Sequence, residues 1–476
     1  MEATSGRKEI AHLQCPPRLL LSHVVHVTLT INQSLYIASH SGEVALPASL
    51  TFRYASHGLV VVKTFSFDDS YVIHATVRVA LNGVPLQAKI SWPGGIGDQD
   101  DAASYSNAQL DAMRDTKEEH LPLKKIVSGT TLTGPFEWAG ISDPYFSAIF
   151  LPDDPGTATL VTLTDQMDAA ETIPRPGFRF GSPSKVTVKV PILGAAMGDR
   201  RGQSSLRLYA GPKDVNVLRE VYSVGNRRTL EPLLDFGFFG LIGKYLFSVL
   251  QFIHTHISFG WSGSWGWAIV ILTVAINLLI LPLRIKTMQS SLKLQRIQPQ
   301  MDAIKVRYKG LKVTDPKRNE MNAEIMQLQK KNGVNMFGGC IPSLIQMPLL
   351  LAFLGMLPKL IELRQATWLW LPDLTATDPW HILPILMVAS QFLVQYYTPS
   401  PGVDPQQQKM MAFIMPVVSG YMAWTYSSGV ALYWLVGNLI SIATQAIMNQ
   451  TNLGREMKAL VMKRQRPFPL GGSARL

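Results

Sequence analysis

The chain has few of the residues on which metal proteins and disulfide-stabilised domains depend. Its 476 residues include two cysteines, Cys15 and Cys340, and their positions match no metal-ligand spacing. Cys15 lies in a polar N-terminal stretch and Cys340 opens an apolar run, so no disulfide between them is expected. Serine-hydrolase, zinc-protease, P-loop and dinucleotide-binding motifs are also missing. We therefore predict a protein with no catalytic residues, no metal and no cofactor.

Acidic residues are missing from five long apolar runs in the C-terminal half, at 265–283, 340–357, 380–397, 410–426 and 429–447. The first of them is nineteen residues without a formal charge, and about 20 apolar residues cross a bilayer as a helix. We therefore predict a polytopic α-helical membrane protein with five core transmembrane helices. The lack of Asp and Glu argues against a transporter that uses an intramembrane carboxylate to couple solute movement to protons or ions.

Positive charge is concentrated between and after these runs. Residues 1–264 carry 23 Lys and Arg against 24 Asp and Glu, whereas residues 265–476 carry 21 against 9. Segment 284–339 and the tail at 451–476 are strongly basic, and cytoplasmic loops are enriched in Lys and Arg. Both are predicted to lie in the cytoplasm, which places the N-terminal domain outside it. The basic excess therefore reports membrane topology, and no DNA contact is expected.

Residues 20–230 predict an extracytoplasmic antiparallel β-sandwich that ends in a short helical connector. Alternating or β-branched runs are separated by Gly, Pro, Asn and Asp, the pattern of many short strands. The polar stretch 93–120 is predicted to be a long loop. The clearest strands are expected at 24–31, 59–67, 71–80 and 185–192.

The first 19 residues predict no defined structure. No signal peptide or anchor is visible before residue 18, although the charge pattern places the next domain outside the cytoplasm. Three explanations are open at this point. An N-terminal anchor is missing from the chain, the start is misassigned, or the topology is inverted.

Segment 231–258 is predicted to contain an amphipathic helix in the membrane interface. Its apolar residues recur at helical spacing, and Lys244, Gln251, His254 and His256 interrupt them. The alternative is that this segment crosses the membrane, which would put the N-terminal domain in the cytoplasm. The expected apolar stripe consists of Ile242, Tyr245, Leu246, Val249, Leu250 and Ile253.

Segment 284–339 predicts a cytoplasmic hairpin of two amphipathic helices. The second helix is expected to begin at Asp315 and Pro316, a capping residue followed by a first-turn proline. Two compatible interpretations are open: the helices only pack on each other, or their basic outer face contacts anionic lipid, the ribosome or a nascent chain. The basic residues expected at such contacts are Lys293, Arg296, Lys305 and Arg307.

Uncharged polar residues recur inside the predicted spans, among them Asn277. Hydrogen bonds between helices would account for them one by one. The alternative is a hydrated cavity lined by several of them, in which polar parts of a passing polypeptide avoid contact with lipid.

Several blocks of the C-terminal half, read in order, resemble the YidC family of membrane protein insertases. They are WGWAIVILTVAINLLILPL, QSSLKLQRIQPQM, GGCIPSLIQMPLLLAFLGML, DPQQQKMMAFIMP and SSGVALYWLVGNLISIATQ, spread over about 230–450. The sequence YAGPKD (209–214) also resembles the end of that family's periplasmic domain. The match covers the whole predicted membrane domain, 259–450, and is therefore highly specific.

The resemblance implies a function and a location. Family members insert membrane proteins and help to fold them, alone or with the Sec translocon, in the inner membrane of bacteria. They use a hydrophilic groove open to the cytoplasm and to lipid, and no cofactor. The resemblance also implies that 236–257 is an interfacial helix, that 284–339 is the cytoplasmic hairpin, and that one N-terminal anchor span is absent here.

One position departs from the family pattern. The family typically has a groove arginine five residues before the proline of the first core span, and here Pro282 places that position at Asn277. An amide can hydrogen-bond a substrate but cannot attract its acidic residues as a guanidinium does. Arg284 follows seven residues later and either supplies a cation at the groove mouth or only flanks the span. By matching position, the residues implied to face or border the groove are Thr273, Asn277, Cys340, Gln346, Met347 and Tyr433.

Two other classes of function are weighed against an insertase. A polytopic small-solute transporter would usually show repeated or broken helices, and no such repeat is visible. A membrane adaptor would use the β domain and the hairpin only to recruit partners.

Overall fold

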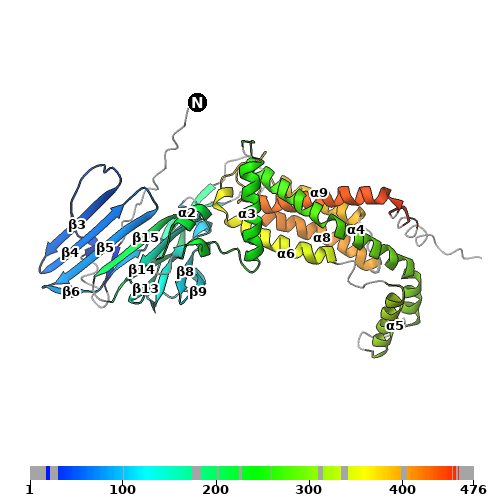
Figure 1. Cartoon of the computed structure of the whole chain (residues 1–476), viewed down its shortest axis with the longest axis horizontal. Coiled ribbons are helices and arrows are strands. Elements are labelled where there is room, and N and C mark those ends of the chain that lie inside the picture. Colours follow the sequence, from blue (N-terminus) through cyan, green and yellow to red (C-terminus); the bar gives the residue numbers. More distant parts are fainter. Residues whose placement is uncertain are drawn as a thin grey trace, which may run out of the picture. The chain divides into compact units, whose positions relative to one another are not determined.

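The computed structural model describes residues 18–21, 31–99, 101–173, 184–200, 203–223, 228–258, 260–308, 315–333, 341–397, 405–452, 454–456 and 459. The chain divides into two units, a β-rich unit Met1–Asp235 and a helical unit Phe236–Leu476 (Figure 1).

Two antiparallel sheets make up the β unit. The first has the strand order β1-β7-β14-β13-β10, and its strands are β1 (Arg18–Leu21), β7 (Ala88–Trp92), β10 (Thr131–Thr133), β13 (Ala158–Ile173) and β14 (Ser184–Asp199). The second has the order β2-β3-β4-β5-β15-β12-β11-β8-β9, with β6 beside β5. Its strands are β2 (Ile37–Ala38), β3 (Ala48–Ser56), β4 (Leu59–Phe67), β5 (Val72–Leu81), β6 (Val84–Leu86), β8 (Gln109–Arg114), β9 (Lys117–Pro122), β11 (Phe136–Ser142), β12 (Phe146–Pro152) and β15 (Ser204–Pro212).

Alternation along the strands builds one core from both sheets. Val61 and Val77 of the second sheet and Leu193 of the first are completely buried in the same cluster. The period of two between buried and exposed side chains is what a half-buried strand requires. The predicted strands at 59–67, 71–80 and 185–192 are confirmed.

Two parts of the strand prediction differ from the structure. The loop predicted at 93–120 is wrong in its second half, which forms β8 and β9. Their charged sequence has little intrinsic preference for strands, but the cross-strand pair Arg114–Glu119, 2.7 Å apart, and the partner strand β11 stabilise them. The strand predicted at 24–31 lies outside the described residues apart from Ile31, which is helical.

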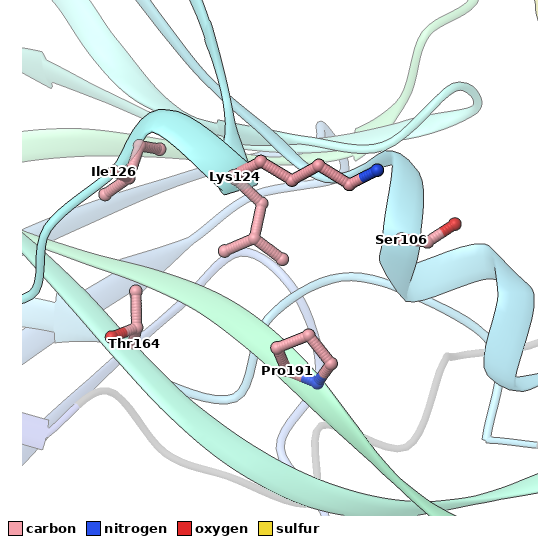
Figure 2. A pocket seen from close by; sticks show the side chains of 6 residues that line it. Ser106, Lys124, Ile126, Thr164 and Pro191 are labelled. Atoms are coloured by element: carbon pink, nitrogen blue, oxygen red, sulfur yellow. The ribbon is translucent and has the colours of Figure 1, made fainter.

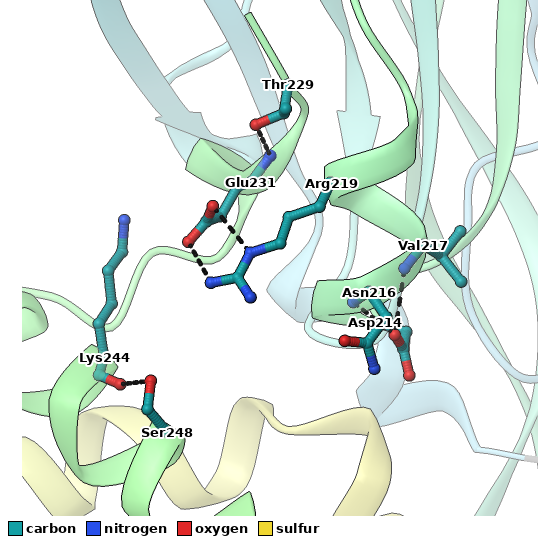
Figure 3. A network of polar contacts seen from close by, with 8 residues as sticks. All are labelled: Asp214, Asn216, Val217, Arg219, Thr229, Glu231, Lys244 and Ser248. Atoms are coloured by element: carbon teal, nitrogen blue, oxygen red, sulfur yellow. Dashed lines mark hydrogen bonds and ion pairs between the residues drawn. The ribbon is translucent and has the colours of Figure 1, made fainter.

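The YAGPKD sequence (209–214) closes the β unit and starts the connector. The Tyr209 hydroxyl donates to the Pro212 carbonyl (2.5 Å), and Lys213 Nζ donates to the Asp143 carbonyl (3.2 Å). Asp214 then caps helix α2 (Val215–Glu220) by accepting from two backbone N–H groups. An ion pair between Arg219 and Glu231 ties α2 to the 3-10 turn at Glu231–Leu233 (Figure 3). The connector predicted at 213–230 is helical over Val215–Glu220.

A buried carboxylate joins strands β8, β9 and β11. Asp111 is fully buried; its Oδ1 accepts from Gln109 Nε2 (2.8 Å) and lies 2.7 Å from His120 Nδ1, while Ser142 donates to its Oδ2. The hydrogen bond between His120 and Asp111 raises the pKa of His120 above its ordinary value. The negative charges of Asp111, Asp235 and Glu118 add to the effect.

A raised histidine pKa predicts that the β unit is less stable at alkaline pH. The contribution of His120 to the free energy of unfolding is complete below its unfolded-state pKa of about 6.5. It is lost as the pH rises through the higher pKa of the folded state. We expect His120→Gln to reduce the fall in unfolding free energy between acidic and mildly alkaline pH. Pulse proteolysis of the full chain in urea measures it, and the exposed His40→Gln is the control. Identical pH profiles for wild type and His120→Gln would contradict this assignment.

The helical unit contains seven helices within the described ranges. They are α3 (Gly240–His256), α4 (Ser264–Arg307), α5 (Lys317–Lys331), α6 (Ile341–Met356), α7 (Ile382–Tyr397), α8 (Pro405–Thr425) and α9 (Ser428–Gln450). Helix α4 is continuous over 44 residues, so no break separates the predicted first span from the first hairpin helix. Pro282 and Pro299 lie inside it, and each removes one backbone donor without ending the helix.

Two described helices, α4 and α9, are long and apolar enough to cross a membrane, and two apolar helices are shorter, α7 and Met410–Thr425 of α8. The predicted number of five spans therefore stays a prediction.

Helix α3 contacts α4 and α6 within this unit and runs steeply across them (Figure 1). Leu246, Leu250 and Ile253 of the predicted stripe are buried, as are Gly243 and Phe247. Tyr245 and Val249 of that stripe are exposed instead. The helix thus has an apolar face against its neighbours and further apolar residues outside, which suits the interface between protein and lipid.

The hairpin prediction agrees with the packing of α5 on α4. Ile297 and Met301 of α4 form a small core with Ile325 and Leu328 of α5. Asp315 Oδ1 accepts from the Lys317 N–H (2.9 Å), the predicted capping role. The connection at 309–314 lies outside the described residues.

Two glycines allow a tryptophan side chain to pack closely against the start of α4. Gly263 has φ +71° and is followed by the first turn, and a Cβ atom on Gly266 would overlap the Trp368 indole. Trp368 is 7% exposed and packs edge-on against Trp267 at 5.6 Å. Close backbone contact of this kind requires glycine at 266.

Gly266→Ala is therefore expected to destabilise the helical unit by about 1–3 kcal/mol, the usual cost of overpacking. Thermal unfolding of the full chain in detergent measures it. Gly437→Ala is the matched control, because a Cβ there meets no atom within 4 Å. It is expected to be neutral or slightly stabilising, since Ala favours helix over Gly. Equal melting temperatures for the two variants would contradict the packing argument.

Candidate functional site

A guanidinium links α4 to α9 at the position that the sequence singles out. Arg284 donates to Asn277 Oδ1 (2.9 Å) and to Ser441 Oγ (3.0 Å). Asn277 uses its own Nδ2 on the Thr273 carbonyl (2.8 Å), which leaves its oxygen for Arg284. The two residues are seven apart, about 10 Å along the helix, so the long arginine side chain extends back toward the amide.

A second polar pair lies between α6 and α9. Gln346 Nε2 donates to the Tyr433 hydroxyl (2.7 Å), and the Tyr433 ring stacks on Phe353 at 4.0 Å. Tyr433 and Ser441 both belong to α9, two turns apart, so this helix carries the partner of Gln346 and the partner of Arg284. We call Asn277, Arg284, Gln346, Tyr433 and Ser441 the polar cluster.

The polar cluster is deep at one end and open at the other. Asn277 and Tyr433 are buried, at 2% and 1% exposure, whereas Arg284 and Gln346 are partly exposed. Gly437 lies between Tyr433 and Ser441 on one face of α9, and a Cβ on it would meet no atom within 4 Å. The face of α9 that carries the cluster is therefore not close-packed at its centre.

Two predicted groove residues, Thr273 and Met347, are not members of this cluster. Thr273 is fully buried, and its hydroxyl donates to the Ile269 carbonyl of its own helix (2.7 Å). Met347 is 62% exposed on the surface of α6. Cys340 lies outside the described residues.

The four predicted hairpin cations are exposed, but two of them are paired. Arg296 forms an ion pair with Glu456, and Arg307 forms one with Glu324 at 2.5 Å. Lys293 and Lys305 take part in none of the ion pairs found in the described part of the chain. The free positive charge of the hairpin is thus smaller than the sequence suggests.

Ser441 is one of the uncharged polar residues inside the predicted spans, but the family resemblance did not mark it as a groove residue. Its signal was spacing, because Tyr433, Gly437 and Ser441 follow one another at intervals of four on α9. A separate polar contact lies between α7 and α9, where Asn438 Nδ2 donates to Ser390 Oγ and to Gln391 Oε1, both at 3.1 Å. Asn438 and Ser390 are buried and Gln391 is partly buried, as expected of a contact between helices.

A cavity of about 320 Å³ lies elsewhere, in the β unit (Figure 2). Leu123, Ile126 and Pro191 form its apolar lining, with Lys124 at its rim. Its lining includes none of the residues predicted from the sequence to form the functional site. Among the described residues no group of three or more His, Cys, Asp or Glu could hold a metal ion.

Two family models match the chain. One, described as "60Kd inner membrane protein", matches residues 257–455, and the other, "YidC periplasmic domain", matches residues 29–249. A curated relative named "Membrane protein insertase YidC" from Endomicrobium trichonymphae is 32% identical over 431 residues, which is 87% of this chain and 75% of that protein. The chain belongs to the YidC family.

Other members of the YidC family are similar to different extents. The insertase of Ralstonia nicotianae is 33% identical over 87% of this chain and 71% of its own length. That of Wolinella succinogenes is 40% identical over 51% of this chain, which is 42% of its own length. The solved structure named "Active YidC insertase crystal structure with the first transmembrane domain resolved" aligns with a TM-score of 0.38 at 15% identity, over 91% of this chain and 83% of that one.

Membership of the YidC family confirms the resemblance found in the sequence. An N-terminal antiparallel β-sandwich is followed by a helical core, as predicted. Residue 277 is an asparagine here, but a guanidinium is still present at this position, because Arg284 donates a hydrogen bond to the Asn277 side chain.

Proposed function

We propose that this chain is a membrane protein insertase and membrane-protein folding chaperone that acts through the polar cluster. The observation that carries the proposal is the Arg284 guanidinium held at Asn277 beside the unfilled face of α9. Family membership supports the same activity. A transporter or an adaptor would not require a partly open cation between two apolar helices.

The proposed mechanism is solvation rather than covalent chemistry. A short polar segment of a nascent membrane protein enters from the cytoplasm and exchanges water for the amide, hydroxyl and guanidinium groups of the cluster. An unsatisfied backbone group in hydrocarbon costs several kcal/mol, so such partners lower the barrier to crossing. The apolar flank of the substrate then moves into lipid, and burial of its apolar surface drives release.

Arg284 gives the cluster a preference for acidic substrate segments. A guanidinium has five N–H donors, and its bonds to Asn277 and Ser441 account for two of them. None of the ion pairs among the described residues involves Arg284. Its remaining donors suit the carboxylate of a translocated Asp or Glu, which Asn277 alone could not attract.

The proposal includes a topology and partners. The β unit lies in the periplasm, the five predicted spans cross the bacterial inner membrane, and the hairpin and C-terminal tail lie in the cytoplasm. The tail at 451–476 and the exposed Lys293 and Lys305 are proposed to contact the ribosome or anionic lipid. The Sec translocon is the proposed partner for larger substrates, and no DNA, metal or cofactor takes part.

Reconstitution tests the function directly. Purified chain in liposomes should protect the translocated segment of a newly synthesised single-span membrane protein from added protease, well above empty liposomes. A solute transporter would give uptake without protection, and an adaptor would give protection only after partners are added. Protection no greater than in empty liposomes would refute the insertase proposal.

A further inference from the structure

The outer face of the second sheet carries a polar surface on β3, β4, β5 and β15, which are neighbours in that order. Cross-strand partners arrange its side chains in rows. Residues between them in sequence, such as Phe52, Phe65 and Val77, face the core, so the rows face outward. We call the following residues the strand grid: Thr51, Thr64, Thr76 and Ser205 in one row; Ser49, Ser66, His74 and Arg207 in the next; and Arg53, Val62 and Arg78 on the other side.

The strand grid contains three arginines and no acidic residue. Arg53 and Arg78 are exposed and Arg207 is partly exposed. None of the three makes an ion pair within the part of the chain that the structure describes. Two carboxylates lie at its margin: Asp153 accepts from Ser205 Oγ (2.6 Å), and Asp68 is bonded to Ser70. The surface is thus positive with unused donors at its centre.

The hydroxyl groups of the grid are ordered by the sheet. Thr51 and Thr64 hydroxyls lie 3.2 Å apart, and Ser66 donates to Ser49 at 3.1 Å. Strands are about 4.8 Å apart, so Arg53 and Arg78, two strands apart, are separated by about 10 Å. Arg207 lies two rows further, about 13 Å along the strands. This spread favours a partner that presents several separate anions over a single small anion.

We propose that the strand grid docks on a surface of anionic phospholipid headgroups. Guanidinium groups bind phosphate oxygens through paired N–H donors, and the serine and threonine hydroxyls add neutral partners for them. Three guanidinium groups spread over about 10–13 Å can each meet a different headgroup of a bilayer. The grid has only Val62 as an apolar member, and it carries no Phe, Tyr or Trp ring on which a base could stack, so headgroup contact suits it better than insertion or nucleic-acid binding.

Tethering makes such weak contacts effective. If the helical unit spans a membrane, as the proposed function requires, the β unit is always close to a bilayer, and linked contacts benefit from a high effective concentration. Each arginine near an anionic surface is worth about a fivefold gain in binding. Three together are expected to contribute on the order of 100-fold.

The test uses the full chain in phosphatidylcholine nanodiscs, with a genetically encoded fluorescent amino acid at Ala55 on the margin of the grid. Vesicles with phosphatidylglycerol and an energy-acceptor lipid are titrated in, and phosphatidylcholine vesicles are the blank. The triple variant Arg53→Gln, Arg78→Gln and Arg207→Gln should weaken the energy transfer on the order of 100-fold in vesicle concentration. A control triple variant on the same unit, Lys117→Gln, Lys124→Gln and Lys125→Gln, removes three exposed cations outside the grid and should stay close to wild type.

Three results would overturn the proposal. The grid variant could bind anionic vesicles as tightly as the control variant. The single variant Arg78→Gln, which removes one exposed side chain, could leave the titration unchanged although the β unit resists protease normally. Heparin, a soluble polyanionic glycan, could bind the grid more tightly than the vesicles do, which would assign the surface to glycan. Vesicle binding is read without any insertion reaction, so its failure leaves the insertase proposal intact and the reverse also holds.

Discussion

Arg284→Gln is expected to lower the insertion of a substrate with an acidic translocated segment by about 10- to 100-fold. A hydrogen bond to a charged group is worth about 1.5–3 kcal/mol, and each 1.4 kcal/mol is a factor of ten in rate. A substrate whose translocated segment has no Asp or Glu should be affected no more than about threefold, because solvation by the neutral groups of the cluster is retained. Protease protection in proteoliposomes measures both.

Two variants separate attraction in the cluster from simple topology. Lys286→Gln removes the same charge from the same flank, but Lys286 is exposed and has no part in the contacts with Asn277 or Ser441. It should insert acidic substrates normally. Asn277→Arg combined with Arg284→Gln moves the cation to the usual family position and should restore most of the loss. If Lys286→Gln is as impaired as Arg284→Gln, the cation only sets topology.

Gly437→Leu is expected to reduce insertion of acidic and neutral substrates alike by at least about tenfold. A side chain at this position would enter the space between Tyr433 and Ser441, where a Cβ meets no atom within 4 Å. It would replace water and polar contacts with an apolar surface, which removes the solvation that a polar segment needs. The same protease-protection assay measures it with both substrates.

The matched control for this prediction is Gly437→Ala, which changes the same residue to a much smaller apolar side chain. Gly437→Ala adds one methyl group into open space and should insert substrates within about twofold of wild type, while improving helix propensity. The melting temperatures of Gly437→Leu and Gly437→Ala in detergent should be similar, because the Cβ position of residue 437 is open. Normal insertion by Gly437→Leu would mean that substrates do not pass this face of α9.

Local patterns predicted most of the fold. The apolar period of helices α3 to α9 and the alternation in β4, β5 and β14 are read along the chain, because each element must bury one face. These patterns failed at β8 and β9. Arg114 and His120 lie in strands there because Glu119 pairs with Arg114, and Asp111 is hydrogen-bonded to His120, across the two strands. They also placed a boundary at residue 284, inside a helix that is continuous through Pro282.

The sequence by itself determined the family, the helical and β-rich halves, and the departure at Asn277, since these depend on residues close together in the chain. Only the tertiary structure decided that Arg284 compensates for this departure. Ser441, which accepts the second hydrogen bond from the Arg284 guanidinium, lies 157 residues from Arg284 in the sequence. Contacts at that separation exist only after α4 and α9 pack together, because helix packing, not spacing along the chain, brings a guanidinium, an amide and a hydroxyl to hydrogen-bonding distance.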